Sequence, residues 1–188
     1  MSRDAAITWW LTGLPGAGKT TLANALAGYL RQQQLSVCVL DGDEIRRGLS
    51  ADLGFGPSAR RENIRRVAEV ARLLNAAGVL AIAALVSPAR EDRAVARDIV
   101  GADGFIEVHV ATPPGVCEQR DPKGMYAAAR RGAITDFTGV SASYEAPEKP
   151  DLTIDTAITD LSAAVDRLMA CRFPLAPEHQ TSPCLSTP

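Results

Sequence analysis

The sequence has no excess of charge of either sign. Its 188 residues carry 20 Lys and Arg against 22 Asp and Glu, a net charge of −2. A protein that coats nucleic acid or lies on an acidic membrane needs a basic excess, so the composition argues against both partners and leaves only local basic clusters. Apolar residues make up 46% and charged residues 22%, which excludes a disordered or low-complexity chain and predicts one globular domain.

Long hydrophobic runs and paired cysteines are also missing. The longest apolar run, residues 79–86, is far shorter than the roughly 20 residues that cross a bilayer. The first residues lack the apolar stretch and cleavage site of a signal peptide, so we expect a soluble, cytoplasmic protein. No C-x-x-C pair occurs, which argues against metal and disulfide frameworks. The widely spaced cysteines are Cys38, Cys117, Cys171 and Cys184.

Strand-like and helix-like patterns alternate along most of the chain. We expect strands at residues 7–12, 37–40, 79–86, 105–110 and 152–154. Helical spacing predicts helices at 20–31, 90–100 and 161–169, and another that begins at a Ser58 cap and stops at Gly78. This order predicts a three-layer α/β domain with a mostly parallel sheet over residues 1–172. Residues 173–188 hold four of the 12 prolines and predict a flexible tail.

A phosphate-binding motif lies where the first predicted strand meets the first predicted helix. Residues 13–20 read G-L-P-G-A-G-K-T and match G-x-x-x-x-G-K-[ST] at every fixed position. The N–H groups of such a loop converge on one anion, and the helix dipole adds to the attraction. Lys19 can bridge the β- and γ-phosphates and Thr20 can ligate Mg²⁺. The predicted nucleotide-binding residues are Gly13, Leu14, Pro15, Gly16, Ala17, Gly18, Lys19, Thr20 and Thr21.

Other classes of P-loop protein fit the chain less well. Switch GTPases read guanine with an N-K-x-D segment, which is absent from the sequence. Asp98 and Gly101 formally match D-x-x-G, but they close a helical pattern and are better explained as a helix end with its glycine stop. The chain is also too short for the extra lobes of motors or transport ATPases. Elimination favours a small-molecule kinase.

A second polar cluster, D-G-D-E-I-R at residues 41–46, follows the second predicted strand. Open α/β sheets bind ligands at this carboxyl edge, which is also where the P-loop lies. Asp41 or Asp43 can accept a proton from a substrate hydroxyl or hold a Mg²⁺-bound water. The alternative is that Asp43 only caps a following helix.

A basic set on the third predicted helix surrounds Asn63. Its members are Arg60, Arg61, Arg65 and Arg66. Helical spacing places Arg60 and Asn63 on one face and Arg61 with Arg65 on another. Arginines suit forked contacts to phosphate or sulfate oxygens, although a solvated helix surface is the usual place for such charges.

Together these motifs resemble those of the adenylyl-sulfate (APS) kinases. Beside the P-loop they comprise D-G-D-x-x-R at 41–46, L-G-F at 53–55, E-N-x-R-R at 62–66, S-P at 87–88, C-E-Q-R-D-P-K-G at 117–124 and F-T-G at 137–139. The resemblance covers residues 5–170. It implies a three-layer P-loop NTPase fold with a helical lid, and MgATP-dependent phosphorylation of the 3′-hydroxyl of adenosine 5′-phosphosulfate to PAPS. As partners it implies the small molecule APS, a homodimer and an association with ATP sulfurylase.

The same resemblance implies roles for individual residues. Those expected to contact APS are Asp43, Arg46, Phe55, Arg60, Asn63, Val86, Ser87, Lys123 and Phe137, with Phe55 stacking on adenine. The residues expected to act in catalysis are Lys19, Asp41 and Asp43, from the motifs described above, and Ser87, which the resemblance implies as a phosphoserine. In-line transfer between two nucleotides needs positioning and no covalent relay, so a pocket-lining role for Ser87 is the simpler interpretation.

The sequence departs from the family pattern in two places. Related enzymes carry lysines after D-P-K-G, whereas residues 125–132 leave Arg130 and Arg131 as the positive charge over the phosphates. Residues 84–87 and Ala89 are smaller than is usual, which predicts a roomier pocket. Two alternatives therefore stay open: a kinase of another small hydroxyl compound, such as a related nucleotide or a sugar acid, and a nucleotide-binding module without catalysis.

Overall fold

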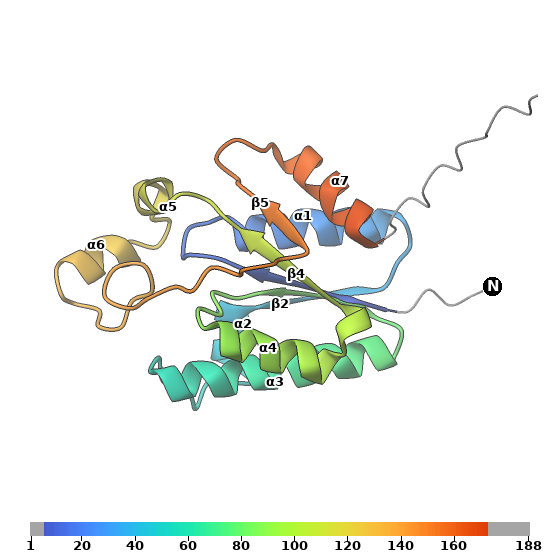
Figure 1. Ribbon diagram of the computed structural model, residues 1–188, viewed down its shortest axis with the longest axis horizontal. Coiled ribbons are helices and arrows are strands. Elements are labelled where there is room, and N and C mark those ends of the chain that lie inside the picture. Colours follow the sequence, from blue (N-terminus) through green and yellow to red (C-terminus); the bar gives the residue numbers. More distant parts are fainter. Residues whose placement is uncertain (1–5, 173–188) are drawn as a thin grey trace, which may run out of the picture.

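A parallel five-stranded sheet forms the middle layer of the molecule (Figure 1). The computed structural model describes residues 6–172, so the tail expected at 173–188 lies outside the described residues. The strands are β1 (Thr8–Thr12), β2 (Val37–Asp41), β3 (Leu80–Ala84), β4 (Phe105–Val110) and β5 (Leu152–Ile154), ordered β2-β3-β1-β4-β5. All four pairings are parallel. The predicted α/β class is confirmed.

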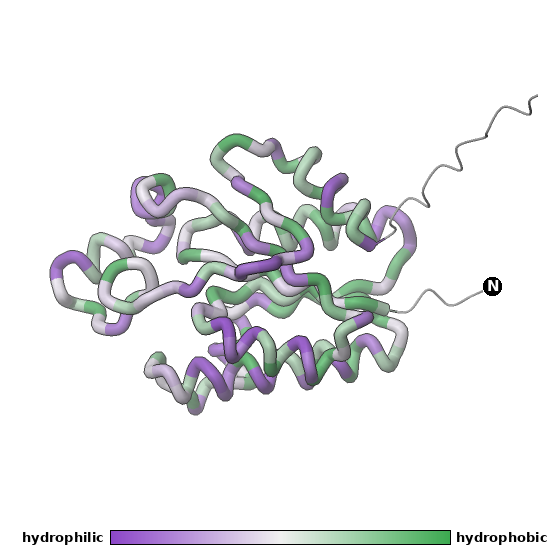
Figure 2. Tube along the Cα trace, in the orientation of Figure 1, coloured by the Kyte–Doolittle hydropathy of each residue, from purple (hydrophilic) through white to green (hydrophobic). Residues whose placement is uncertain are grey.

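Helices cover both faces of this sheet (Figure 1). One face carries α1 (Lys19–Gln32) and α7 (Leu161–Arg172), and the other carries α3 (Pro57–Ala76) and α4 (Arg90–Val100). Successive residues of β1 point to opposite faces, so Trp9 belongs to the first core and Trp10 to the second. Figure 2 shows apolar residues along the sheet and hydrophilic ones on the outer sides of α3 and α4. The strands therefore form a central layer that is covered on both faces, and its carboxyl edge is open.

Some predicted boundaries need correction. Helix α3 begins at Pro57 with Gly56 as its N-cap, so the Ser58 cap is wrong. Proline suits the first helical position because its missing N–H would be unsatisfied there. Strand β3 ends at Ala84, two residues before the predicted end, and the chain beyond it forms a wall of the site. Gly101 closes α4 with φ of +96°, as its helix-stop pattern predicts.

Shorter elements lie at the carboxyl edge of the sheet. Helix α2 (Gly42–Arg47) follows β2, and α5 (Pro114–Arg120) with α6 (Met125–Arg130) follows β4. A single 3₁₀ turn, η1 (Ala102–Gly104), leads into β4. In Figure 1, α5 and α6 project beyond one end of the sheet as the predicted helical lid. Within residues 6–172, no helix is long and apolar enough to cross a membrane.

Candidate active site

One cleft of about 1090 Å³ at the carboxyl edge of the sheet collects most of the predicted site residues. It is lined by Pro15, Gly16, Gly18, Lys19, Thr20, Thr21, Asp41, Asp43, Arg46, Phe55, Arg60, Asn63, Val86, Ser87, Lys123 and Phe137. Three predicted P-loop residues, Gly13, Leu14 and Ala17, lie behind this lining. They contribute backbone carbonyls to internal hydrogen bonds.

The P-loop glycines are needed because other chain segments press against them. A Cβ on Gly13 would lie 2.5 Å from the carbonyl oxygen of Val110, and one on Gly16 would lie 2.7 Å from that of Cys117. Both residues also have positive φ, +155° and +75°, which side chains rarely allow. The loop is thereby clamped between the end of β4 and α5. Helix α1 starts at Lys19, within the motif, and directs its N-terminus at the cleft.

Lys19 is a buried cation with no carboxylate in hydrogen-bond contact among the described residues. Its side chain is 8% exposed, and Nζ donates to the carbonyl oxygens of Gly13 (2.9 Å) and Leu14 (2.8 Å). Burial lowers its pKa to about 8, and the charges of Asp41 and Asp43 oppose this shift only in part. The Lys19 ammonium group therefore gains an anionic hydrogen-bond partner only when a polyanion binds in the loop.

Asp41 connects the P-loop to α2. One carboxylate oxygen accepts from the Thr20 hydroxyl at 2.7 Å, and the other accepts from the backbone N–H of Asp43 at 2.9 Å. Asp41 is therefore the N-cap of α2, and the alternative that Asp43 serves as the cap is wrong. The Asp43 carboxylate instead forms an ion pair with Lys123, which comes from the lid side of the cleft.

Arg46 and Phe55 form the outer rim of the cleft. The Arg46 guanidinium donates to the carbonyl oxygen of Gly54 at 2.8 Å and lies 4.5 Å from the centroid of the Phe55 ring. Phe55 is 63% exposed, so an apolar ring faces open space beside a cation. Burial, then the nearby charge of Arg60, lowers the pKa of Arg46. A planar aromatic ligand can stack on such a ring.

Arg60 and Asn63 share one face of α3, as their spacing predicts, and both line the cleft. Arg60 donates to the Phe55 carbonyl oxygen at 2.7 Å and to the Thr138 hydroxyl at 2.5 Å. Asn63 is 4% exposed, and its Oδ1 is buried without a hydrogen-bond partner within residues 6–172. The second predicted face is occupied by protein ion pairs, Arg61 with Asp92 and Glu91 and Arg65 with Glu62.

Val86 and Ser87 form the wall of the cleft between the P-loop and the rim at Arg46 and Phe55. Ser87 is 3% exposed and has φ of +37°, and its hydroxyl oxygen accepts from the Trp10 indole N–H at 3.2 Å. The Val86 carbonyl oxygen accepts from the Thr12 hydroxyl at 2.8 Å. These contacts suit a residue that shapes the pocket. A phosphoserine at Ser87 stays a prediction.

Comparison with known proteins agrees with this geometry. The family described as adenylylsulphate kinase matches residues 5–155. The chain belongs to this family. An adenylyl-sulfate kinase of Shewanella amazonensis is 56% identical over 85% of this chain and 81% of its own, and one of Paraburkholderia xenovorans is 53% identical over 90% and 94%. The solved Mycobacterium tuberculosis APS kinase CysC, in complex with AMPPNP and APS, superimposes with a TM-score of 0.86 at 42% identity, covering 89% of this chain and 98% of that one.

Sequence reasoning missed two residues that close the P-loop end. Arg120 donates to the Thr156 hydroxyl at 2.7 Å and to its carbonyl oxygen at 2.9 Å. Thr156 in turn donates to the carbonyl oxygen of Ala17 at 2.8 Å, and both side chains line the cleft. Arg120 belongs to the C-E-Q-R-D-P-K-G motif, so a signal existed. Thr156 follows a three-residue strand and has no signal in the sequence around it.

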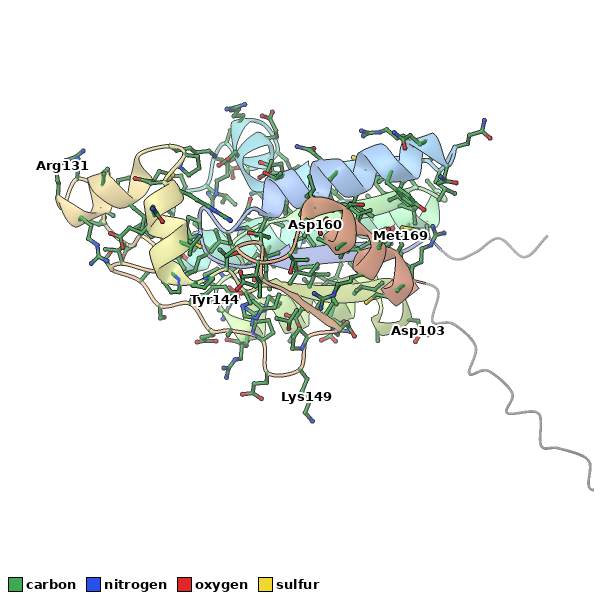
Figure 3. All side chains as sticks on the ribbon, turned by 90° about the horizontal axis from the view of Figure 1, so that it is seen from above. Asp103, Arg131, Tyr144, Lys149, Asp160 and Met169 are labelled. Atoms are coloured by element: carbon green, nitrogen blue, oxygen red, sulfur yellow. The ribbon has the colours of Figure 1, made fainter. Side chains whose placement is uncertain are left out.

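The lid docks on the P-loop through aromatic residues. The Tyr126 hydroxyl donates to the carbonyl oxygen of Pro15 at 3.0 Å, and its ring meets Phe137 edge to face at 5.0 Å. Burial raises the pKa of Tyr126 to about 12. The expected charge over the phosphates is not where the sequence predicts it, because Arg130 pairs with Glu118 and Arg131 points away at the outer tip of the lid (Figure 3). Arg120 and Lys123 are the lid cations that line the cleft.

Proposed function

We propose that this member of the adenylylsulphate kinase family transfers the γ-phosphoryl group of ATP to the 3′-hydroxyl of adenosine 5′-phosphosulfate, forming PAPS and ADP. One observation carries the proposal: a single cleft joins a complete P-loop to a second end with two arginines, a buried unpartnered amide oxygen and an exposed aromatic ring. The related structure in complex with AMPPNP and APS supports the proposal that the two substrates are ATP and APS.

At the P-loop end, the chain's own groups would hold the phosphates of ATP. The backbone N–H groups of residues 13–20 and the α1 N-terminus bind the polyanion, and Lys19 turns from its carbonyl partners to the β- and γ-oxygens. The hydroxyl of Thr20 and the carboxylate of Asp41 are adjacent oxygen donors, a set that fits Mg²⁺. When bound there, Mg²⁺ would neutralise charge on the transferring phosphoryl group.

At the other end, side chains would orient APS for in-line attack. Phe55 would stack on the adenine, and Arg46 and Arg60 would neutralise the charge of the phosphosulfate. The unpartnered Oδ1 of Asn63 would accept a hydrogen bond from the bound APS. Asp43 lies between the two ends and takes the proton from the attacking hydroxyl. Val86 and Ser87 form the wall, while Lys123 and Phe137 close the cleft from the lid and from the chain after it.

An acceptor survey tests this function. Purified protein is assayed for ADP release with MgATP and APS, AMP, shikimate or gluconate as acceptor. We expect kcat/KM for APS to exceed that for AMP by about 100-fold or more, because a site built for the charged sulfate group leaves its arginines unpaired with the shorter acceptor. Turnover of another acceptor without APS-dependent ADP release would overturn the proposal.

The proposal extends to assembly. We expect a homodimer and an association with ATP sulfurylase, which light scattering of the purified protein, alone and mixed with that enzyme, would test. A mass equal to that of the monomer under both conditions would contradict both expectations.

A further inference from the structure

A buried arginine lies directly behind the wall of the cleft. Arg93 of α4 is 3% exposed and forms an ion pair with Glu107 of β4 at 2.7 Å. Its remaining donors reach two backbone carbonyl oxygens, those of Ser87 and Glu145, each at 2.7 Å. Because a buried guanidinium is costly unless its donors are satisfied, this set of partners fixes both carbonyl groups with respect to the sheet.

The first carbonyl belongs to the residue whose backbone most needs support. Ser87 has φ of +37°, a conformation that non-glycine residues keep only when the surroundings hold them in it. Thr12 donates to the same carbonyl oxygen at 3.3 Å, and the Trp10 indole N–H donates to the Ser87 hydroxyl oxygen at 3.2 Å. Of these contacts, the one from Arg93 is the shortest.

The second carbonyl belongs to the chain that returns from the lid. Residues 131–151 (the return segment) carry Phe137 over the cleft and then run back to β5, with Tyr144 against the body of the molecule in Figure 3. Glu145 also donates its N–H to the carbonyl oxygen of Pro88 at 2.9 Å, and the Tyr144 hydroxyl lies 3.1 Å from that of Thr12. Arg93 thus contacts the wall and the return segment at the same time.

We propose that Arg93 is a positioning residue for the acceptor. Arg93 is anchored by its ion pair with Glu107 and fixes the positions of Ser87 and the return segment relative to each other at the APS end of the cleft. The inference rests on the proposed function for the identity of the acceptor. Arg93 is absent from the cleft lining, so it acts through the groups it holds. Small displacements of such groups weaken productive binding strongly.

The decisive variant is Arg93→Lys, which keeps a cation beside Glu107 but loses the fork that reaches both carbonyl groups. We expect KM for APS to rise by about 10-fold and KM for ATP to change by less than about two-fold. Arg72→Lys is the control. Arg72 of α3 pairs with Glu69 and contacts neither Glu107 nor the return segment in the described structure, so both KM values should stay at the level of the unmodified protein.

NMR of the tryptophan indole N–H groups reports on the position of Ser87 in the wall and needs no enzyme turnover. The chain has two tryptophans: Trp10 donates to Ser87, whereas Trp9 donates to the carbonyl oxygen of Leu168. In Arg93→Lys the indole N–H resonance of Trp10 should shift and that of Trp9 should stay in place. Trp10→Phe assigns the two peaks. If Arg93→Lys does not fold, Arg93→Met combined with Glu107→Met removes both charges and should show the same APS-specific defect.

The outcomes separate the two proposals. An unmodified protein that does not phosphorylate APS overturns the proposed function, and the Trp10 resonance still decides whether Arg93 holds Ser87. Normal KM for APS with an unmoved Trp10 resonance overturns the positioning role. Equal losses for ATP and APS, with a lowered melting temperature, would show a merely structural role and overturn it as well.

Discussion

The two ends of the cleft are built in different ways. The P-loop end is one continuous segment, residues 13–20, whose backbone surrounds a lysine that is 8% exposed. The APS end is assembled from α2, the chain before α3, α3 itself and the wall after β3, and its aromatic ring, Phe55, is 63% exposed. One end is a local structure that a short motif specifies. The other is a tertiary arrangement in which arginine side chains hold separate segments together.

The two ends of the cleft also differ in how far their charged groups are removed from water. At the P-loop end a charge is kept out of water, and burial lowers the pKa of Lys19. At the APS end the charges are half-exposed and paired with carbonyl oxygens and carboxylates, so each contact is screened and weak. Substitutions should therefore have their largest effects in the P-loop and graded effects around the acceptor.

Lys19→Met should have the largest effect on activity and a distinctive effect on stability. Loss of the phosphate-binding amine should lower kcat/KM by about 10³-fold or more. The pKa of Lys19 is about 8 in the folded protein, below the usual 10.5 of a lysine, so the unfolded state binds more protons between these pH values. The free energy of unfolding of the unmodified protein, relative to the variant, should then rise by about 3 kcal/mol from pH 8 to pH 10.5.

Chemical denaturation of both proteins across this pH range measures the difference. Lys149→Met is the matched control, since Lys149 points away from the body in Figure 3 and its removal should leave the pH profile unchanged. A difference between the unmodified protein and Lys19→Met that is flat with pH would contradict the buried-charge account of the P-loop end.

Asp43→Asn tests the point where the two ends meet. If Asp43 takes the proton of the acceptor hydroxyl, the variant should lose about 10²-fold or more in kcat with little change in KM for ATP. Steady-state kinetics with APS measure this. Glu69→Gln is the control, because Glu69 pairs with Arg72 on α3 and does not line the cleft. A kcat equal to that of the unmodified protein would reduce Asp43 to a partner of Lys123.

The sequence predicts the P-loop end well because its information is local. The motif, the strand before it and the helix after it all lie within residues 7–32, and the structure places each as expected. Helical spacing likewise predicts that Arg60 and Asn63 face the same way. Both results need only the geometry of one element or one turn.

Contacts between distant segments explain what could not be predicted. Asp41 caps α2 because β2 runs one residue beyond its apolar pattern, and the Asp43 carboxylate can then pair with Lys123. Arg130 pairs with Glu118 and Arg131 lies at the outer tip of the lid, because the lid docks through the contacts of Tyr126 with Phe137 and Pro15, which composition does not reveal. Arg93 looks like an ordinary helix-surface charge until its partner on β4 is known.

Arg66→Ala should have the smallest effect and tests whether the APS end is held by side chains at all. Arg66 donates to the Leu49 carbonyl oxygen and to Asp52, each at 2.9 Å, and so fastens the loop that carries Phe55. We expect KM for APS to rise about three-fold, KM for ATP to stay constant, and added salt to narrow the gap between the two proteins. Arg72→Ala removes a comparable pair with Glu69 on the same helix and should change neither constant. An effect of Arg66→Ala on ATP as large as that on APS would mean that the two ends are mechanically coupled, and that their separate construction does not make them independent.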